Sequence, residues 1–199
     1  MLSFNPKDRT ERDNYKMLIG TVIPRPIAFV TSKNTDGVIN GAPFSYFNIV
    51  SSNPPMLSVS IQKKGKSPKD TARNIKTNKE FVVHIVDQDN VEKINETAAS
   101  LTPEESEIEK AGLTLAPSTV VSVPGVNESK VRFECTLEHS IEIGEGTDLL
   151  IGRIVQYHLD EEVYEEGGYI NYDHLGAVSR LAGHDYASIG KVQTIQRPK

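Results

Sequence analysis

Val131-Arg132-Phe133-Glu134-Cys135-Thr136-Leu137-Glu138 alternates between apolar and polar side chains. Successive side chains of a strand point to opposite faces of a sheet, so this stretch predicts a strand with one buried face and one solvated face. Gly144-Glu145-Gly146-Thr147-Asp148 follows as a turn, and the apolar segment 149–159 predicts a long returning strand. Together they predict an antiparallel hairpin.

Three further segments predict strands, because they are rich in β-branched and aromatic residues or alternate in polarity. The first ends at Asn34-Thr35-Asp36-Gly37, a turn signal that predicts a hairpin with Val38-Ile39-Asn40. The three strands are expected at residues 26–32, 56–61 and 81–86.

Helices are expected at three places. In Ser67-Pro68-Lys69-Asp70 the serine is a typical N-cap and the proline a typical first helical residue, so a helix is predicted from Ser67 to about Asn78. A second candidate covers residues 90–100, and Thr102-Pro103-Glu104-Glu105 begins a third with a capping box that ends near Gly112. The sequence therefore predicts a mainly β fold with peripheral helices, an antiparallel barrel or sandwich rather than a parallel α/β sheet.

Length, charge and composition narrow the class of protein. The 199 residues fit one domain, expected over residues 1–199. The net charge of −5, without a basic stripe, argues against a nucleic-acid partner but permits a small anionic ligand. No apolar run approaches the ~20 residues that cross a bilayer, and no signal-peptide pattern is visible at the N-terminus. With a single cysteine, the chain is expected to be cytoplasmic, without a membrane partner.

The densest unusual stretch is Asn40-Gly41-Ala42-Pro43-Phe44-Ser45-Tyr46-Phe47-Asn48. Small residues and a proline let a backbone approach a flat ligand closely, while Ser45 and Asn48 can hydrogen bond to polar ring edges. An ordinary loop entering a strand has the same composition, so both interpretations stay open.

A phosphate site is the second candidate, because a helix N-terminus offers unpaired N–H groups and partial positive charge. Three lysines, Lys63, Lys64 and Lys66, immediately precede the predicted helix. A solvated charged turn would look the same, and Asp70 has a competing role as a first-turn acid. The candidate side chains are Ser60, Lys66, Asp70, Thr71 and Asn74.

Two cations in other segments are also candidates. Arg25 stands between two prolines, which hold it extended and suit a positioned cation. Near the C-terminus, Gly183 could turn the chain so that Arg180 and Tyr186 reach a ligand. Each segment is equally compatible with a surface turn.

Other kinds of site find little support. The histidines have no metal-ligand spacing, so no metal is expected. Cys135 is expected to be a small core residue rather than a reactive thiol, and the acids of residues 161–166 a solvated turn. Neither G-x-S-x-G, G-x-G-x-x-G nor a P-loop occurs, which argues against a hydrolase triad, a Rossmann domain and an NTPase. The five histidines are His84, His139, His158, His174 and His184.

Several of these segments, taken in order, resemble the flavin reductase-like, FMN-binding split-barrel family, of which flavoredoxin is the closest named type. The resemblance covers about residues 20–190, and its two most specific motifs are A-P-F-S-Y-F-N and K-D-T-x-x-N-I. The segments are Pro24-Arg25-Pro26-Ile27-Ala28, residues 40–48, Ser51-x-x-Pro54-Pro55, residues 69–75, Phe81-Val82-Val83 and Arg180-Leu181-Ala182-Gly183-x-x-Tyr186-Ala187.

The resemblance implies an antiparallel split β-barrel that forms a homodimer with FMN at its interface. Residues implied to line the isoalloxazine ring are Asn40, Gly41, Ala42, Pro43, Phe44 and Ser45, with Arg25 near the flavin as well. Residues implied near the ribityl–phosphate end are Ser60, Lys66, Asp70, Thr71 and Asn74. Arg180 and Tyr186 match a C-terminal motif that closes over the flavin, although this chain has Ala182 where that motif more often has glycine.

The function implied by the resemblance is that of an NAD(P)H:flavin oxidoreductase passing hydride or electrons through FMN. One alternative is a flavoredoxin-like electron carrier that holds FMN tightly and exchanges electrons with a protein redox partner. A third is a flavin-binding protein without turnover. No nicotinamide-binding motif is evident, so the sequence leaves all three open.

Overall fold

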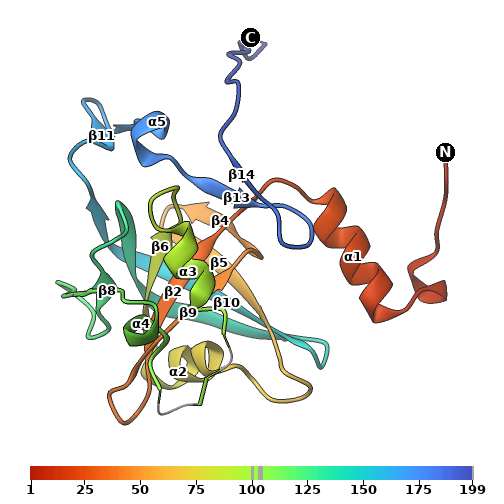
Figure 1. Ribbon diagram of the computed structural model, residues 1–199, viewed down its shortest axis with the longest axis horizontal. Coiled ribbons are helices and arrows are strands. Elements are labelled where there is room, and N and C mark those ends of the chain that lie inside the picture. The colour runs from red at the N-terminus through yellow and green to blue at the C-terminus, as the bar shows by residue number, and fades with distance from the viewer. Residues whose placement is uncertain (100, 103–104, 199) are drawn as a thin grey trace.

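The computed structural model describes residues 1–99, 101–102 and 105–198. Its largest element is a seven-stranded antiparallel sheet with the strand order β3-β2-β6-β9-β10-β5-β4 (Figure 1). The strands of this sheet are β2 (Ala28–Lys33), β3 (Ile39–Phe44), β4 (Phe47–Ser52), β5 (Pro55–Gln62), β6 (Glu80–Ile85), β9 (Val131–Ile143) and β10 (Thr147–Leu159).

The two longest strands form the hairpin that the alternating stretch predicts. The β9–β10 ladder runs from Ile143 opposite Thr147 to Val131 opposite Leu159, with two irregularities in register. The predicted β2–β3 hairpin is also confirmed, since Lys33 pairs with Ile39 across the turn.

The sheet curls so that strands far apart in its order approach each other. β3 lies at one edge and β5 next to the other edge, yet the two strands are in contact. Phe44 of β3 and Ser60 of β5 line the same pocket. Helix α2 (Asp70–Asn78) packs against the curled sheet, where its Ala72 and Ile75 join the main core. The mainly β fold with peripheral helices is therefore confirmed.

Residues 27–30, which lead into and begin β2, are apolar without interruption because both faces of the strand are covered there. Ala28 and Val30 point into the core shared with α2. Ile27, which precedes β2, and Phe29 belong to a second core that includes side chains of α3 (Val91–Glu96) and α4 (Glu107–Lys110). Alternate residues of a strand face opposite sides, so double coverage calls for a continuous apolar run.

Short elements complete the described fold. β1 (Arg25–Pro26), β13 (Val178–Arg180) and β14 (Tyr186–Ser188) form a three-stranded sheet that joins the two ends of the chain. The remaining elements are η1 (Pro6–Asp8), β7 (Leu115–Ala116), β8 (Gly125–Val126), β11 (Tyr164–Glu165), β12 (Tyr169–Ile170) and α5 (Tyr172–Leu175). Within the described ranges, no helix combines the length and apolar character of a membrane-crossing segment.

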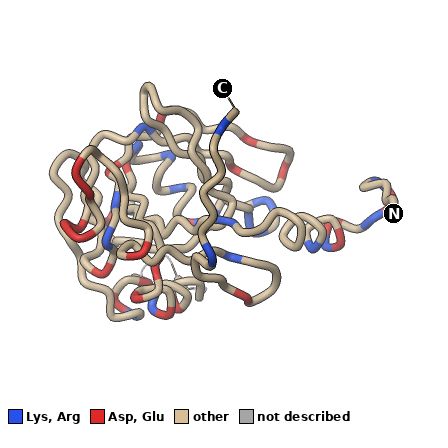
Figure 2. Tube along the Cα trace, turned by 90° about the horizontal axis from the view of Figure 1, so that it is seen from above, with Lys and Arg blue, Asp and Glu red and all other residues tan. Residues whose placement is uncertain are grey.

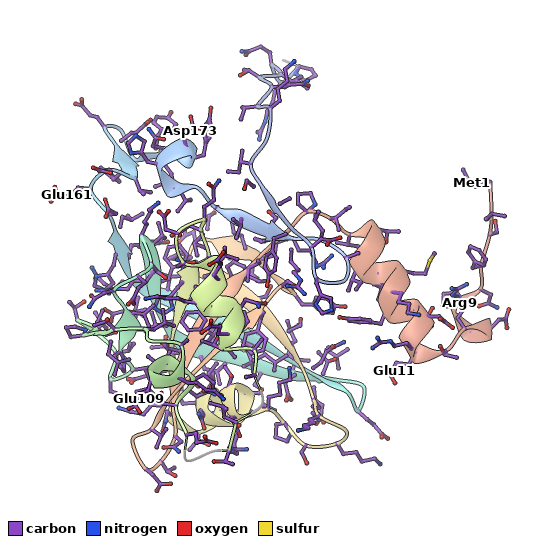
Figure 3. The ribbon with its side chains drawn as sticks, viewed as in Figure 1. Met1, Arg9, Glu11, Glu109, Glu161 and Asp173 are labelled. Carbon is purple, nitrogen blue, oxygen red and sulfur yellow. The ribbon has the colours of Figure 1, made fainter. Side chains whose placement is uncertain are left out.

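Helix α1 (Glu11–Thr21) was not expected from the sequence. Thr10 caps it by accepting a hydrogen bond from the N–H of Asp13 at 3.1 Å, but none of its residues is buried. The helix projects away from the curled sheet (Figures 1 and 2), and Arg9 and Glu11 lie at its outer end (Figure 3). The cap at Thr10 was a local signal for this helix, although the helix contributes no residue to the core.

The three predicted helices exist with different bounds. The second, predicted at residues 90–100, is observed as α3, and its predicted end at residue 100 lies outside the described residues. The third is reduced to α4, and positions 103–104 of its predicted start also lie outside the described residues. The first begins at Asp70 rather than just after Ser67, because Lys64 and Ser67 bond to each other's backbone in a tight turn.

Glu134 corrects the predicted two-faced pattern of β9, since its side chain is fully buried rather than solvated. It accepts hydrogen bonds from the backbone N–H groups of Thr119, Val120 and Val121 at 2.6 to 2.8 Å, and lies 2.6 Å from His158 Nε2. Burial acts to raise the pKa of Glu134, but these hydrogen bonds outweigh it and lower the pKa to about 2. The carboxylate thus fastens the 119–121 loop to the sheet.

We expect Glu134→Gln to lower the free energy of unfolding by about 2 to 4 kcal/mol at pH 7, because an amide cannot accept from every donor that the carboxylate serves. A folded-state pKa below the ordinary value stabilises the protein above pH 4.5, and this stability is lost as the pH falls toward 2. In urea titrations, the difference from wild type should be constant between pH 7 and 5 and smaller at pH 3.5. The exposed Glu145→Gln is the control, and equal stability of the Glu134 variant at pH 7 would contradict the assignment.

Candidate functional site

Two adjoining pockets lie along strand β3 and share Pro43, Phe44 and Lys69. The main pocket, of about 510 Å³, lies between β3, the start of α2, residues 97–99 and Leu101. The side pocket, of about 160 Å³, lies between β3, β5, α1 and the turn after β13. Most of the sequence-predicted residues line one pocket or the other, namely Arg25, Asn40, Ala42, Pro43, Phe44, Ser45, Ser60, Asp70, Thr71 and Arg180.

A larger hollow of about 750 Å³ lies on another part of the surface, lined by α4 and the residues around it. It contains none of the sequence-predicted site residues. Its charged side chains are Glu105, Glu109 and Lys110, an acidic balance that does not favour an anionic ligand. The two pockets along β3 are therefore the candidate site.

The start of α2 forms one wall of the main pocket. Lys69 is the N-cap of this helix, and no side-chain hydrogen bond caps it. The N–H groups of the first turn of a helix have no partner within the helix and carry partial positive charge. Lys64 and Lys69 line the pocket beside them. This wall offers backbone donors and two cations to an anionic group.

Asn40, Thr71 and Asn74 lie together and are joined by hydrogen bonds among themselves and with Ser32. Asn40 Oδ1 accepts a hydrogen bond from Thr71 Oγ1 at 2.8 Å. Ser32 Oγ lies 3.3 Å from both Asn40 Oδ1 and Asn74 Nδ2. These four side chains are buried, so they form a polar network that holds α2 against β2 and β3 behind the pocket wall.

Glu107 of α4 completes this network and was not identified from the sequence. Its Oε2 accepts from Asn40 Nδ2 at 2.9 Å and from the N–H of Gly41 at 3.3 Å. Burial raises the pKa of Glu107, against the opposing effect of these hydrogen bonds. The neighbouring Ile108 occupies the space that a side chain at Gly41 would need, with 2.4 Å between its Cδ1 and an ideal Cβ. Gly41 therefore serves close packing of α4 on β3.

Among the residues that the structure describes, the side pocket is lined by three cations, Arg25, Lys69 and Arg180, and by no acid. Neutral polar side chains at its wall include Ser45, Ser60 and Gln62. In a chain whose net charge is −5, this concentration of positive charge stands out. It favours a ligand with a negatively charged or electron-rich edge.

Arg180 and Tyr186 lie next to each other on the paired strands β13 and β14. The guanidinium of Arg180 lies 4.4 Å from the centre of the Tyr186 ring and donates to the carbonyl of Gly183 at 2.6 Å. The Tyr186 hydroxyl donates to Asn95 Oδ1 at 2.8 Å. Arg180 therefore lines the side pocket, whereas Tyr186 supports it and lines neither pocket.

Lys66 is the sequence-predicted residue that lies farthest from this arrangement. Its side chain is 88 % exposed, lies 3.4 Å from Glu145, and lines neither pocket. Lys69 and Lys64 stand instead at the pocket wall. Because Lys69 is the first residue of the K-D-T-x-x-N-I motif, the sequence contained a signal that could have identified it.

The structure buries His84 and, as predicted, Cys135. His84 is buried, and burial lowers its pKa to about 4. Its Nε2 accepts from the N–H of Val126 at 3.0 Å, so the proton lies on Nδ1 and is donated to the carbonyl of Phe29. Cys135 is a buried core residue whose thiol pKa is raised by burial. No cluster of potential metal ligands occurs within the described parts of the chain.

A known protein family matches most of the chain. Residues 19–178 match the family model described as "Flavin reductase like domain". This match includes both pockets' contributions from β3, β5 and α2. It confirms the resemblance inferred from the sequence motifs.

Solved structures are similar over nearly the whole chain. Nitrilotriacetate monooxygenase component B from Bacillus cereus is 55 % identical, with a TM-score of 0.96 and 98 % of each chain covered. The 2-nitrobenzoate 2-nitroreductase NbaA of Pseudomonas fluorescens is 30 % identical, with a TM-score of 0.91, covering 99 % of this chain and 96 % of its own. A Shewanella frigidimarina flavin reductase with a split barrel domain is 22 % identical, with a TM-score of 0.86 and full coverage of both chains. The predicted split-barrel fold is confirmed.

We expect that Glu107→Gln, unlike Glu134→Gln, does not destabilise the protein at pH 7. A raised pKa means that the folded state favours the protonated, neutral form of Glu107, so ionisation of this group costs stability as the pH rises above 4.5. The neutral amide should therefore leave the free energy of unfolding at pH 7 unchanged within about 1 kcal/mol or increase it. Urea titrations at pH 5 and 7 measure this, and a loss as large as that of Glu134→Gln would show that the ionised form is needed.

Proposed function

Because the chain belongs to the flavin reductase-like domain family, we propose that it is an FMN-dependent oxidoreductase that takes reducing equivalents from NAD(P)H. The names of two similar proteins, a monooxygenase component and a nitroreductase, denote oxidation and reduction chemistry. The structural observation that carries the proposal is the main pocket, where the uncapped start of α2 stands beside Lys64 and Lys69.

The two pockets fit FMN in size and charge. Their volumes of about 510 and 160 Å³ fall, taken together, within the ~300–1,000 Å³ typical of ligand pockets. The phosphate would be held by Lys64, Lys69 and the N–H groups that begin α2. Asp70 also lines this pocket, but its carboxylate is paired with Arg73. Its charge is thus offset within the helix.

The ring system would lie along Pro43, Phe44 and Ser45, where the two pockets meet. A proline and the backbone of an edge strand permit close approach of a flat ligand. Ser60 and Gln62, on the facing strand β5, supply hydrogen-bonding groups for its polar edge. The curl of the sheet is what brings these two strands to one ligand.

When bound, FMN supplies the hydride-accepting and electron-transferring chemistry. The chain's own residues bind and orient it, and the walls of the pockets limit access of water. The positive charges of Arg25, Lys69 and Arg180 at the side pocket favour the negative charge that reduction adds to a flavin. Reduction therefore requires no acid or base from the protein.

We further propose that two copies form a homodimer with the flavin at their interface. Exposed apolar side chains stand on α1, on the two residues that follow it and on the edge strand β4. A projecting helix and an edge strand with apolar surface are features that association buries. These side chains are Met17, Leu18, Val22, Ile23, Ile49 and Val50. Sedimentation equilibrium should give twice the chain mass.

The reduced flavin would serve a second protein. A component B in the name of a similar monooxygenase implies at least one further component. Such a partner, or free flavin that diffuses to it, would be the acceptor of the electrons.

We expect the purified protein to bind about one FMN per chain and the bound flavin to bleach when NADH or NADPH is added without oxygen. Stopped-flow absorbance measures the rate with each donor. A flavin that bleaches only with dithionite or with a protein donor would contradict the reductase and favour the electron carrier. Failure to bind FMN at all would overturn the proposed function.

We expect Lys69→Ala to weaken FMN about tenfold or more, because it removes a charge-assisted hydrogen bond to the phosphate. Riboflavin lacks that phosphate, so its affinity should change by less than about twofold. Quenching of flavin fluorescence gives both dissociation constants. Lys66→Ala is the matched control, since Lys66 lies outside both pockets, and it should leave FMN affinity unchanged. Equal losses for FMN and riboflavin would exclude a phosphate contact at Lys69.

A further inference from the structure

The guanidinium of Arg25 is buried, with 6 % of the residue exposed, and contacts carbonyls rather than a carboxylate. Its Nη1 donates to the carbonyls of Ile19 and Val22 at 2.7 and 2.6 Å. Its Nη2 donates to the carbonyl of Leu181 at 2.8 Å, and its Nε lies 3.5 Å from Ser45 Oγ. All three nitrogens are therefore engaged within the chain.

Two of these carbonyls, those of Ile19 and Val22, lie at the C-terminal end of α1. The last turn of α1 contains no basic residue. Carbonyls at the end of a helix carry partial negative charge and lack intrahelical partners. Arg25, which lies beyond the helix on β1, supplies the missing cation.

Arg25 is also the polar connection between α1 and the barrel. α1 has no buried residue, and its other hydrogen bonds stay within the N-terminal segment, for example from Asn14 Nδ2 to the carbonyl of Pro6. Among the described residues, the bonds from Arg25 are the only hydrogen bonds that tie α1 to the sheet. Within one copy of the chain, the hydrogen bonds that the described residues supply to seat this helix therefore come from one side chain.

The residues that Arg25 holds are the ones that form the side pocket. Ile19, Leu181 and Ser45 all line it, and α1 contributes Tyr15 as well. Arg25 thus joins three walls that come from the N-terminal helix, the C-terminal turn and the end of β3.

We propose that Arg25 is a positioning residue that couples the seating of α1 on the barrel to ligand binding in the side pocket. The donors of its guanidinium hold the walls of the side pocket in place. Coupling between the seating of α1 and ligand binding is reciprocal, so a ligand that fills the pocket also stabilises α1 on the barrel. The proposal rests on the proposed function only for the identity of the ligand, FMN.

Substitution by lysine separates this role from a simple contribution of charge. Lysine keeps the positive charge but cannot reach several carbonyls with a planar fork. If Arg25 acts by charge on the ligand, Arg25→Lys retains FMN affinity. If it acts by positioning, Arg25→Lys and Arg25→Met lose affinity to a similar extent.

The first experiment uses the full-length protein without ligand. Trypsin cleaves after Lys16, an exposed residue of α1, only when the helix opens locally. Mass spectrometry of the product that begins at Met17 gives the rate. We expect about tenfold faster cleavage in Arg25→Lys and Arg25→Met, with unchanged circular dichroism. Arg153→Lys, which disturbs a fork to Glu138 on the barrel surface, should cleave at the wild-type rate.

The second experiment measures coupling. Saturating FMN should slow cleavage after Lys16 in the wild type, which needs no variant and is unaffected by any folding defect. FMN dissociation constants should rise about tenfold in both Arg25 variants and stay unchanged in Arg153→Lys.

The outcomes are distinct. Wild-type cleavage that FMN does not slow, although FMN binds, overturns the coupling. Retained FMN affinity in Arg25→Lys overturns the positioning role in favour of charge. An unchanged cleavage rate in the folded, ligand-free variants overturns the role of Arg25 in seating α1. If the wild type fails to bind FMN, the proposed function fails, while cleavage of the ligand-free variants still decides whether Arg25 seats α1.

Discussion

Backbone hydrogen bonds along β10 hold the two halves of the barrel together, because β10 pairs with β9 on one side and with β5 on the other. The β3, β2 and β6 strands lie beyond β9, and β4 lies beyond β5. Both halves contribute to the candidate site, with Phe44 from one and Ser60 from the other. The approach of these halves to each other therefore depends on this long ladder and on the right-handed twist that curls the sheet.

Two buried carboxyl groups of this fold, Glu134 and Glu107, have pKa values shifted in opposite directions. Glu134 is surrounded by donors, so that its ionised form is favoured and fastens a loop. Glu107 receives fewer donors, and burial dominates its pKa. The difference follows from the balance between desolvation and hydrogen bonding. One carboxylate is an anchor that needs its charge, and the other is a packing element of the pocket wall.

The polar residues of the candidate site divide into those that build its walls and those that face its pockets. Asn40, Thr71 and Asn74 stabilise the wall, whereas Lys64 and Lys69 face the main pocket. Arg25 is intermediate, since its charge lines the side pocket while its donors hold α1 and the C-terminal turn. A family motif thus contains residues that build the site as well as residues that would touch a ligand.

The sequence by itself indicated the central hairpin, the strands β2, β5 and β6 and the family, because alternation of residues 131–138 and the motifs at 40–48 and 69–75 are local signals, whereas β4 was not predicted. Only the tertiary structure decided which side chains face the pocket. Glu107 bonds to Asn40 across 67 positions of sequence, and Arg25 bonds to Leu181 across 156, so no local pattern could pair them. Glu134 looked solvated by alternation but is buried by a loop that folds over it. α1 was not predicted, and the rest of the chain buries none of its residues. The physical reason is common to all four: local periodicity reports which face of an element is apolar, whereas hydrogen-bond partners and burial depend on what the rest of the chain lays against that face.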